Sequence, residues 1–211
     1  MKVLHVPFIA NPDNRCVPAT TGMILAYFMP EKKYTMDELD ELCGYVEGRG
    51  TWQTQSLLAL HKLGLQVHQI EDFDHEAFVD DPAKYLSSIL DKEALEYQLK
   101  HTDLKLEAAR IKEYMDLGLP LEKRPATDDD IRHFIDDGWL VRLEVNDRPL
   151  AGRSGYNGHS IVVVGYDDNE VTIHNPDGIN GNKANQKVSW ELLNQAWKEF
   201  GGSFSLYAFK K

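Results

Sequence analysis

The stretch Gly158-His159-Ser160-Ile161-Val162-Val163-Val164-Gly165-Tyr166 places a Gly-His pair directly before a run of apolar, β-branched residues. Such a run is typical of a buried strand. A tight Asp167-Asp168-Asn169 turn follows, and the next run of alternating residues ends at Asn175-Pro176. The pattern predicts an antiparallel hairpin with strands at about 160–166 and 170–174.

Side-chain alternation assigns the polar ends of this hairpin to defined faces. His159 shares a face with Ile161 and Val163, and Asn175 shares a face with Ile173 on the second strand. His174 points the opposite way. We therefore predict that His159 and Asn175 lie roughly across from each other, within reach of a cross-strand pair.

Cys16 lies where the first helix is predicted to begin. A turn cluster precedes it, with Asn14 available as the cap, and Pro18 falls in the first turn, where a missing N–H is tolerated. The helix is predicted to end at Phe28. A thiol reacts as thiolate, which the free N–H groups of a helix start and a neighbouring imidazolium both favour.

These positions favour a thiol-dependent site, with Cys16 as nucleophile, His159 as general base and then acid, and Asn175 orienting the imidazole. Taken singly, a cysteine is more often a small buried hydrophobe, and a strand-edge histidine is usually structural. That is our interpretation of Cys43. The remaining histidines lack metal-site spacing, and residues 175–182 are better explained as a turn than as a calcium loop. We predict no metal and no cofactor.

Composition excludes several classes of protein. The 211 residues are 42% apolar and 27% charged, which is ordinary for one globular domain over 1–211. The net charge of −11 argues against nucleic acid and anionic membrane as partners. No run is long and apolar enough for a membrane span, and the apolar stretch at the start of the chain is too short for the core of a signal peptide. We expect a cytoplasmic protein without disulfides.

The order of the other elements predicts the fold class α+β, with helices first and antiparallel strands last. Between them, residues 74–125 form a helical insertion. Its apolar positions repeat every three or four residues from Leu90 to Met115, as on one long helix or two joined ones. The structural interpretation of this segment is an added helix packed on the core. The functional interpretation is a lid or an arm that binds a protein partner.

The pattern resembles the papain-like family of bacteriocin-processing (double-glycine leader) peptidases and their stand-alone relatives. The resemblance covers residues 6–25, 50–67 and about 128–176, and it leaves out 74–125. That family's nucleophile begins a Cys-Gly-Pro-Ala type motif, here Cys16-Val17-Pro18-Ala19. Its histidine opens a Gly-His-hydrophobic strand, here residues 158–162. Its third member precedes proline, usually as Asp-Pro, here Asn175-Pro176.

The resemblance implies a papain-like cysteine peptidase fold, with Cys in the N-terminal helical half and His and Asn on the C-terminal antiparallel sheet. It also implies an oxyanion hole made by the Cys16 N–H and, in the family, by a glutamine several residues before the cysteine. This chain has Asn11 or Asn14 there instead, each a shorter amide, and Asn11 is the better candidate because it follows residues 6–9 as the family's glutamine does. It also has Val17 where the family has glycine, so access to the thiol is narrower.

We therefore expect a hydrolase that cleaves a peptide or amide bond through a thioester. Residues 146–158 are predicted to form a mobile loop beside the substrate, where Arg148 or Arg153 contacts an acidic or carboxylate-bearing group. Transfer of the acyl group to an amine shares the same intermediate. The alternative to an enzyme is a catalytically weak binding module that uses 74–125 as its interaction surface. Val17 and the missing glutamine favour this alternative.

Overall fold

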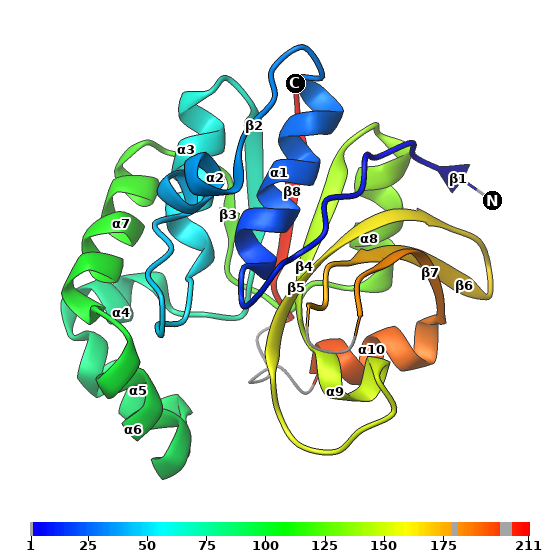
Figure 1. Cartoon of the computed structure of the whole chain (residues 1–211). Coiled ribbons are helices and arrows are strands. Elements are labelled where there is room, and N and C mark those ends of the chain that lie inside the picture. Colours follow the sequence, from blue (N-terminus) through cyan, green and yellow to red (C-terminus); the bar gives the residue numbers. More distant parts are fainter. Residues whose placement is uncertain (1, 179–180, 199–203) are drawn as a thin grey trace.

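The computed structural model describes residues 2–178, 181–198 and 204–211 (Figure 1). These residues form an eight-stranded sheet in the order β3-β2-β8-β4-β5-β6-β7, with β1 added beside β5. The pair β2–β3 is parallel, and the other pairs are antiparallel. The strands are β1 Lys2–Val3, β2 Gln66–Ile70, β3 Leu121–Glu122, β4 Leu140–Asn146, β5 Gly158–Tyr166, β6 Glu170–Asn175, β7 Lys183–Ser189 and β8 Leu206–Lys210.

Helices cover both faces of this sheet, and Figure 1 shows α2–α7 gathered on one side of the molecule and α8–α10 on the other. The helices are α1 Cys16–Phe28, α2 Met36–Cys43, α3 Gln53–Lys62, α4 His75–Asp80, α5 Pro82–Ile89, α6 Lys92–His101, α7 Leu104–Asp116, α8 Asp128–Asp136, α9 Asp147–Leu150 and α10 Trp190–Lys198. The predicted α+β class is correct.

The continuous apolar run of β5 is explained by burial on both sides. Ile161 and Val163 pack into the core with α8 and α10, whereas Val162 and Val164 pack into a second core with α1 and α3. A strand covered on both faces needs apolar residues at every position instead of alternating ones. Gly165 is required for another reason, because a Cβ there would collide with the backbone carbonyl of Lys2 on β1.

The predicted hairpin is present, but its register differs from the expectation. Val162 pairs with His174 and Val163 with Ile173, and a bulge shifts the pairing before Gly165. Continuing this register places Asn175 opposite Ile161, so His159 and Asn175 are diagonal neighbours and not directly opposite. The diagonal separation is still within reach of two long polar side chains.

The segment 74–125 contains four helices, and the predicted periodic stripe runs over two of them. The stripe is interrupted between α6 and α7, where the side chain of Asp103 accepts a hydrogen bond from the N–H of Leu106 and caps α7. Ala108 and Ile111 are buried in a small core of their own, whereas Tyr97 on α6 is exposed. The description of 74–125 as an insertion stays a prediction.

Three further elements depart from the expectations. A first strand, which the sequence predicts over residues 3–8, is limited to β1; α9 interrupts the predicted 146–158 loop; and β7 was not predicted. The sequence of β7, Lys-Ala-Asn-Gln-Lys-Val-Ser, is polar because much of it is exposed at the edge of the sheet. The sequence also predicts a last strand over residues 203–209; residue 203 lies outside the described residues, and the observed strand is β8. Within the described part of the chain, no helix is both long and apolar enough to cross a bilayer.

Candidate active site

Cys16 is the first residue of α1, as predicted, but the helix is not capped by Asn14. The cap position is Arg15, and its side chain makes no capping hydrogen bond. The preceding loop is instead held by Asn11, whose Oδ1 accepts from the backbone N–H groups of Asp13 and Arg15, both at 3.0 Å. Among the residues that the structure describes, the start of α1 therefore lacks a capping side chain, and the Cys16 thiol there is partly exposed.

His159 lies buried at the start of β5 and contacts both of its predicted partners. Its Nε2 donates a hydrogen bond of 2.7 Å to Asn175 Oδ1. Burial alone would lower the pKa of His159, but the hydrogen bond and charge of Cys16, and then Asn175, raise it above its usual value. Because Nε2 is committed to Asn175, the bond with Cys16 falls to Nδ1. The three side chains thus form one connected chain of contacts.

A pair of hydroxyl groups holds the start of α1 against the start of β5. Thr20 lies one turn after Cys16, and its Oγ1 is 3.1 Å from the Oγ of Ser160, the residue after His159. The same Oγ1 donates to the carbonyl of Cys16 at 2.9 Å. Both side chains are fully buried. A buried hydroxyl without a partner is costly, so this contact fixes the first turn of α1 against the beginning of β5.

Asn175 is buried at the end of β6, and its second contact was not expected from the sequence. Its Nδ2 donates to Gln186 Oε1 on β7 at 3.0 Å. The signal that would have indicated β7 is the turn cluster at 175–182, because a turn after a strand favours a returning partner strand. The polar sequence of 183–189 concealed it.

Asn11 connects the loop before Cys16 to the loop after Asn175. Its Nδ2 donates to the carbonyl of Pro176 at 3.0 Å, and its backbone exchanges two hydrogen bonds with the side chain of Asn182. A Cβ at Gly178 would lie 2.9 Å from the Asn11 carbonyl, so the two loops touch closely. One of the two Nδ2 hydrogens is therefore used in the fold, and the role in an oxyanion hole stays a prediction.

The two arginines predicted to contact substrate lie on the segment that includes α9. Arg148 has its Nε 3.9 Å from Asp147 Oδ1. Arg153 is exposed beyond the end of α9. Their contact with an acidic group of a substrate stays a prediction.

A polar network that the sequence did not indicate lies beside the site. Glu144, opposite Ser160 in the sheet, accepts hydrogen bonds from Gln53 Nε2 at 2.8 Å and from the Tyr207 hydroxyl at 3.0 Å. Burial, followed by the charge of Glu71, raises the pKa of Glu144 to about 7. The fully buried Arg142, two residues earlier on the same strand, donates to hydroxyls of α1 and α3.

Cys43 is a buried thiol that donates to Thr21 Oγ1 at 3.3 Å. Burial is the main cause that raises its pKa to about 11. It is therefore an inert thiol near pH 7, which agrees with its interpretation as a small buried hydrophobe.

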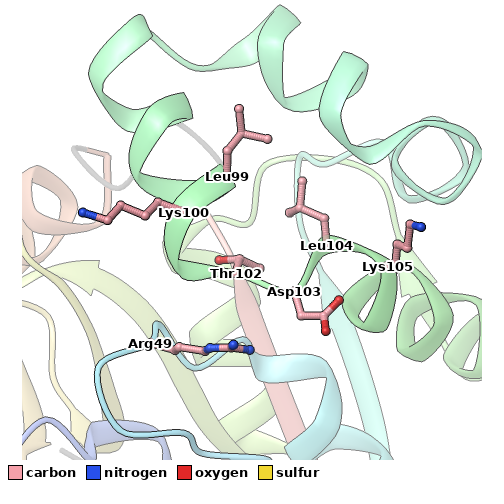
Figure 2. Close-up of a pocket in the computed structure, with 7 residues that line it drawn as sticks. All are labelled: Arg49, Leu99, Lys100, Thr102, Asp103, Leu104 and Lys105. Atoms are coloured by element: carbon pink, nitrogen blue, oxygen red, sulfur yellow. The ribbon is translucent and has the colours of Figure 1, made fainter.

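A surface pocket lies apart from these residues, at the junction of α6 and α7. Its lining is Arg49, Leu99, Lys100, Thr102, Asp103, Leu104 and Lys105. Figure 2 shows the lysine side chains pointing away from each other on either side of Thr102 and Asp103. None of the predicted site residues lines it, so this pocket is separate from the Cys16–His159–Asn175 site.

Comparisons with known proteins were made for the whole chain. A family model described as peptidase C39-like matches residues 3–205. No curated protein matches. The fold is similar to that of a double-glycine motif protease from an AMS/PCAT transporter, solved in complex with the leader peptide, with a TM-score of 0.52 and 15% identity over 99% of this chain and 94% of the other.

Two further solved structures share the fold. The peptidase domain of Streptococcus ComA, a bifunctional ABC transporter involved in a quorum-sensing pathway, has a TM-score of 0.51 and 17% identity over 98% of this chain and all of that domain. A C39-like peptidase from Bacillus anthracis has a TM-score of 0.57 and 15% identity over 100% of this chain and 98% of the other. At these identities the likeness concerns the fold.

Proposed function

The chain belongs to the peptidase C39-like family, whose fold is that of papain-like cysteine peptidases, and from this membership we propose the chemistry of its site. Cys16 is the nucleophile, His159 the general base and then acid, and Asn175 the residue that orients the imidazole. The bond attacked is a peptide or amide bond, and the intermediate is a thioester. The observation that carries the proposal is the contact of buried His159 with Cys16 on one side and Asn175 on the other.

The reaction proceeds in two displacements. The Cys16 proton moves to His159 Nδ1, and the sulfur attacks the carbonyl carbon of the substrate. The tetrahedral intermediate collapses as the C–N bond breaks, and the leaving amine takes the proton from His159. Water then adds to the thioester with His159 as base, the C–S bond breaks, and the carboxylate product and the thiol are formed.

The raised pKa of His159 suits this sequence. A thiolate next to an imidazolium is the reactive pair, and a ring that holds its proton more firmly favours that pair over the neutral one. The Cys16 N–H at the start of α1 is the natural donor to the oxyanion, and the remaining Nδ2 hydrogen of Asn11 is the proposed second donor. The buried Nε2–Asn175 bond keeps the other nitrogen directed at the sulfur.

The substrate class follows from the family and from a structural relative. The AMS/PCAT transporter protease was solved with a leader peptide bound, and we propose a peptide substrate for this chain as well. The Arg148 and Arg153 side chains are proposed to contact an acidic or carboxylate-bearing part of it. We keep the predicted location, the cytoplasm, as part of the proposal.

The test is cleavage of a complex peptide mixture, with new termini identified by mass spectrometry. We expect new termini with the wild-type protein and none with Cys16→Ala or His159→Ala. Cys43→Ala is the matched control, because its thiol is fully buried and bonded to Thr21, and the variant should cleave normally. Cleavage by Cys16→Ala would contradict the proposal, and so would a wild-type protein that neither cleaves nor acquires an acyl group.

The same assay separates hydrolysis from acyl transfer. Added glycinamide competes with water for the thioester, so a transferase would yield mostly the glycinamide adduct, whereas a hydrolase would yield mostly the free acid. Formation of either product requires the same Cys16 intermediate.

A further inference from the structure

We propose that Gln186 is a positioning residue that sets the orientation of the Asn175 carboxamide and, through it, the position of the proton on the His159 ring. The inference rests on the proposed function. It concerns a residue on β7, a strand at the edge of the sheet, that neither sequence pattern nor family motif indicated.

Two hydrogen bonds link His159 to Asn175 and Asn175 to Gln186, each donated in the same direction. His159 Nε2 donates to Asn175 Oδ1 at 2.7 Å, and Asn175 Nδ2 donates to Gln186 Oε1 at 3.0 Å. Asn175 is 3% exposed, so its amide has little access to water as a substitute partner. Both ends of the amide are therefore occupied by protein groups.

The orientation of this amide decides what His159 does. An amide has an acceptor at one end and two donor hydrogens at the other. With Oδ1 toward the ring, Nε2 must carry a hydrogen, which leaves Nδ1 free to accept the Cys16 proton. With the amide reversed, Nδ2 would face the ring, Nε2 would have to accept, and the hydrogen would sit on Nδ1, where it blocks proton transfer from sulfur.

An aspartate, the residue usual at this position in the resembled family, has no such ambiguity because both of its oxygens accept. Asparagine needs an acceptor for its amide nitrogen, and Gln186 Oε1 supplies one. Removal of that acceptor would leave a buried N–H without a partner in the productive orientation and take away the preference against reversal. In the observed arrangement, Gln186 Oε1 is the acceptor that the Asn175 amide nitrogen uses.

The fold places Gln186 beside Asn175 by means of a β-bulge. Ile173 pairs with Gln186, but Asn175 pairs with Lys183, so β7 contains one extra residue in this interval. Asn185 lies in that interval with φ of +52°, a left-handed conformation that asparagine tolerates better than most residues. Bulges of this kind often redirect a side chain next to an active site.

His174 anchors the bulge from the opposite face of β6. Its Nδ1 accepts the backbone N–H of Asn185 at 3.1 Å, and its Nε2 donates to the carbonyl of Val6 at 2.8 Å. Both ring nitrogens are used, and the ring is buried. The position of Gln186 is therefore fixed by local backbone contacts and does not depend on a flexible loop.

The experiment measures the ring proton directly and then the rate. Nitrogen-15 NMR of histidine-labelled protein, at a pH where the ring is neutral, reports which ring nitrogen of His159 carries hydrogen; His159→Ala assigns the signals. We expect the Nε2–H form in the wild type and in Gln186→Glu, which keeps an acceptor. Gln186→Leu should show a substantial Nδ1–H fraction. Lys187→Leu, an exposed neighbour on the same strand, is the matched control and should match the wild type.

A double-mutant cycle separates positioning from a merely structural role. Gln186→Leu should slow the reaction of Cys16 with chloroacetamide about 3- to 10-fold, the effect of one buried hydrogen bond. In the Asn175→Asp background the same substitution should cost less than about 2-fold, because a carboxylate has no unproductive orientation. Gln186→Glu should restore the wild-type rate and move the pH profile upward, since a carboxylate near the ring favours the imidazolium; Asp147 already acts on the ring in this sense.

Equal losses in both backgrounds, or an unchanged NMR spectrum in Gln186→Leu, would overturn the proposal. If Gln186→Leu fails to fold, Gln186→Thr replaces it, because threonine suits a strand and is too short to reach Asn175. The NMR readout does not depend on turnover. A normal proton position in a protein that cleaves no peptide would refute the proposed function alone.

Discussion

Glu144 offers a test of how the polar groups beside the site are arranged. The substitution Glu144→Gln keeps the shape of the side chain and an oxygen that accepts from the Tyr207 hydroxyl. Gln53 can reverse its own amide, so that its oxygen accepts from the NH2 group of the new side chain. In the wild type, burial and the nearby charge of Glu71 raise the pKa of Glu144 from 4.5 to about 7. The folded protein therefore binds a proton that the unfolded chain has already released.

The sign and size of the effect follow from this difference. Between pH 4.5 and about 7 the folded state holds more protons than the unfolded state, so stability falls as pH rises through this window. At about 1.4 kcal/mol for each tenfold change in the proton equilibrium, the full penalty is about 3 kcal/mol above pH 7. Because the Glu144 side chain is partly exposed, solvent screening reduces this penalty, and we expect roughly 1 to 3 kcal/mol.

The assay is urea unfolding of wild type and Glu144→Gln at a series of pH values from 4 to 8. The difference in free energy of unfolding should change in favour of the variant by about 1 to 3 kcal/mol between pH 4.5 and 7 and stay constant above that. Ser87→Ala, on exposed α5, is a control that should show no such pH dependence. A difference between wild type and Glu144→Gln that is independent of pH would refute the reasoning.

Three other outcomes are expected. Iodoacetamide at pH 7 should modify Cys16 and leave Cys43 unmodified in the folded protein, as peptide mapping would show; labelling of both at similar rates would mean that the buried thiol is accessible. Asn175→Ala should lower the cleavage rate about 10- to 100-fold by removing a 2.7 Å bond to the imidazole, and an unchanged rate would remove Asn175 from the proposed triad. Asn11→Ala should lower the free energy of unfolding by about 1 to 3 kcal/mol, because the loops before Cys16 and after residue 175 lose their link; an unaltered urea midpoint would contradict that link.

The parts of the fold that could be predicted from sequence are those in which local pattern and burial agree. The β-branched run of β5 predicts a buried strand. Thr35 and Thr127 are each followed closely by acidic residues, a pattern that predicts a capped helix start, and the structure has a capping box at both. β7 was missed because its side chains are mostly polar and exposed, so the strand is stabilised by pairing with β6 and not by its own composition. The separation of α6 from α7 was missed because a heptad-like stripe continues across Asp103, while that residue caps a new helix.

The site shows the same division. Alternation was enough to assign His159 and Asn175 to defined faces of their own strands, and the helix start was enough to locate Cys16. The register was wrong by one diagonal step, because the turn lies further along the chain than expected: Tyr166 pairs with Val171. The bulge before Gly165 then moves Asn175 from opposite Val162 to opposite Ile161, on the face of His159. Gln186, Glu144 and the Thr20–Ser160 contact depend on tertiary proximity between distant segments, and a single sequence contains no pattern from which such proximity can be derived.

The measurement that tests the central claim most directly is the site and rate of reaction with a peptide that carries an electrophilic carbon in place of the scissile carbonyl. Intact-mass and fragment spectra should show one adduct per chain, located on Cys16. In His159→Ala the adduct should form at least about a hundredfold more slowly, because general-base assistance is lost. An adduct elsewhere, or equal labelling of wild type and His159→Ala, would contradict the account.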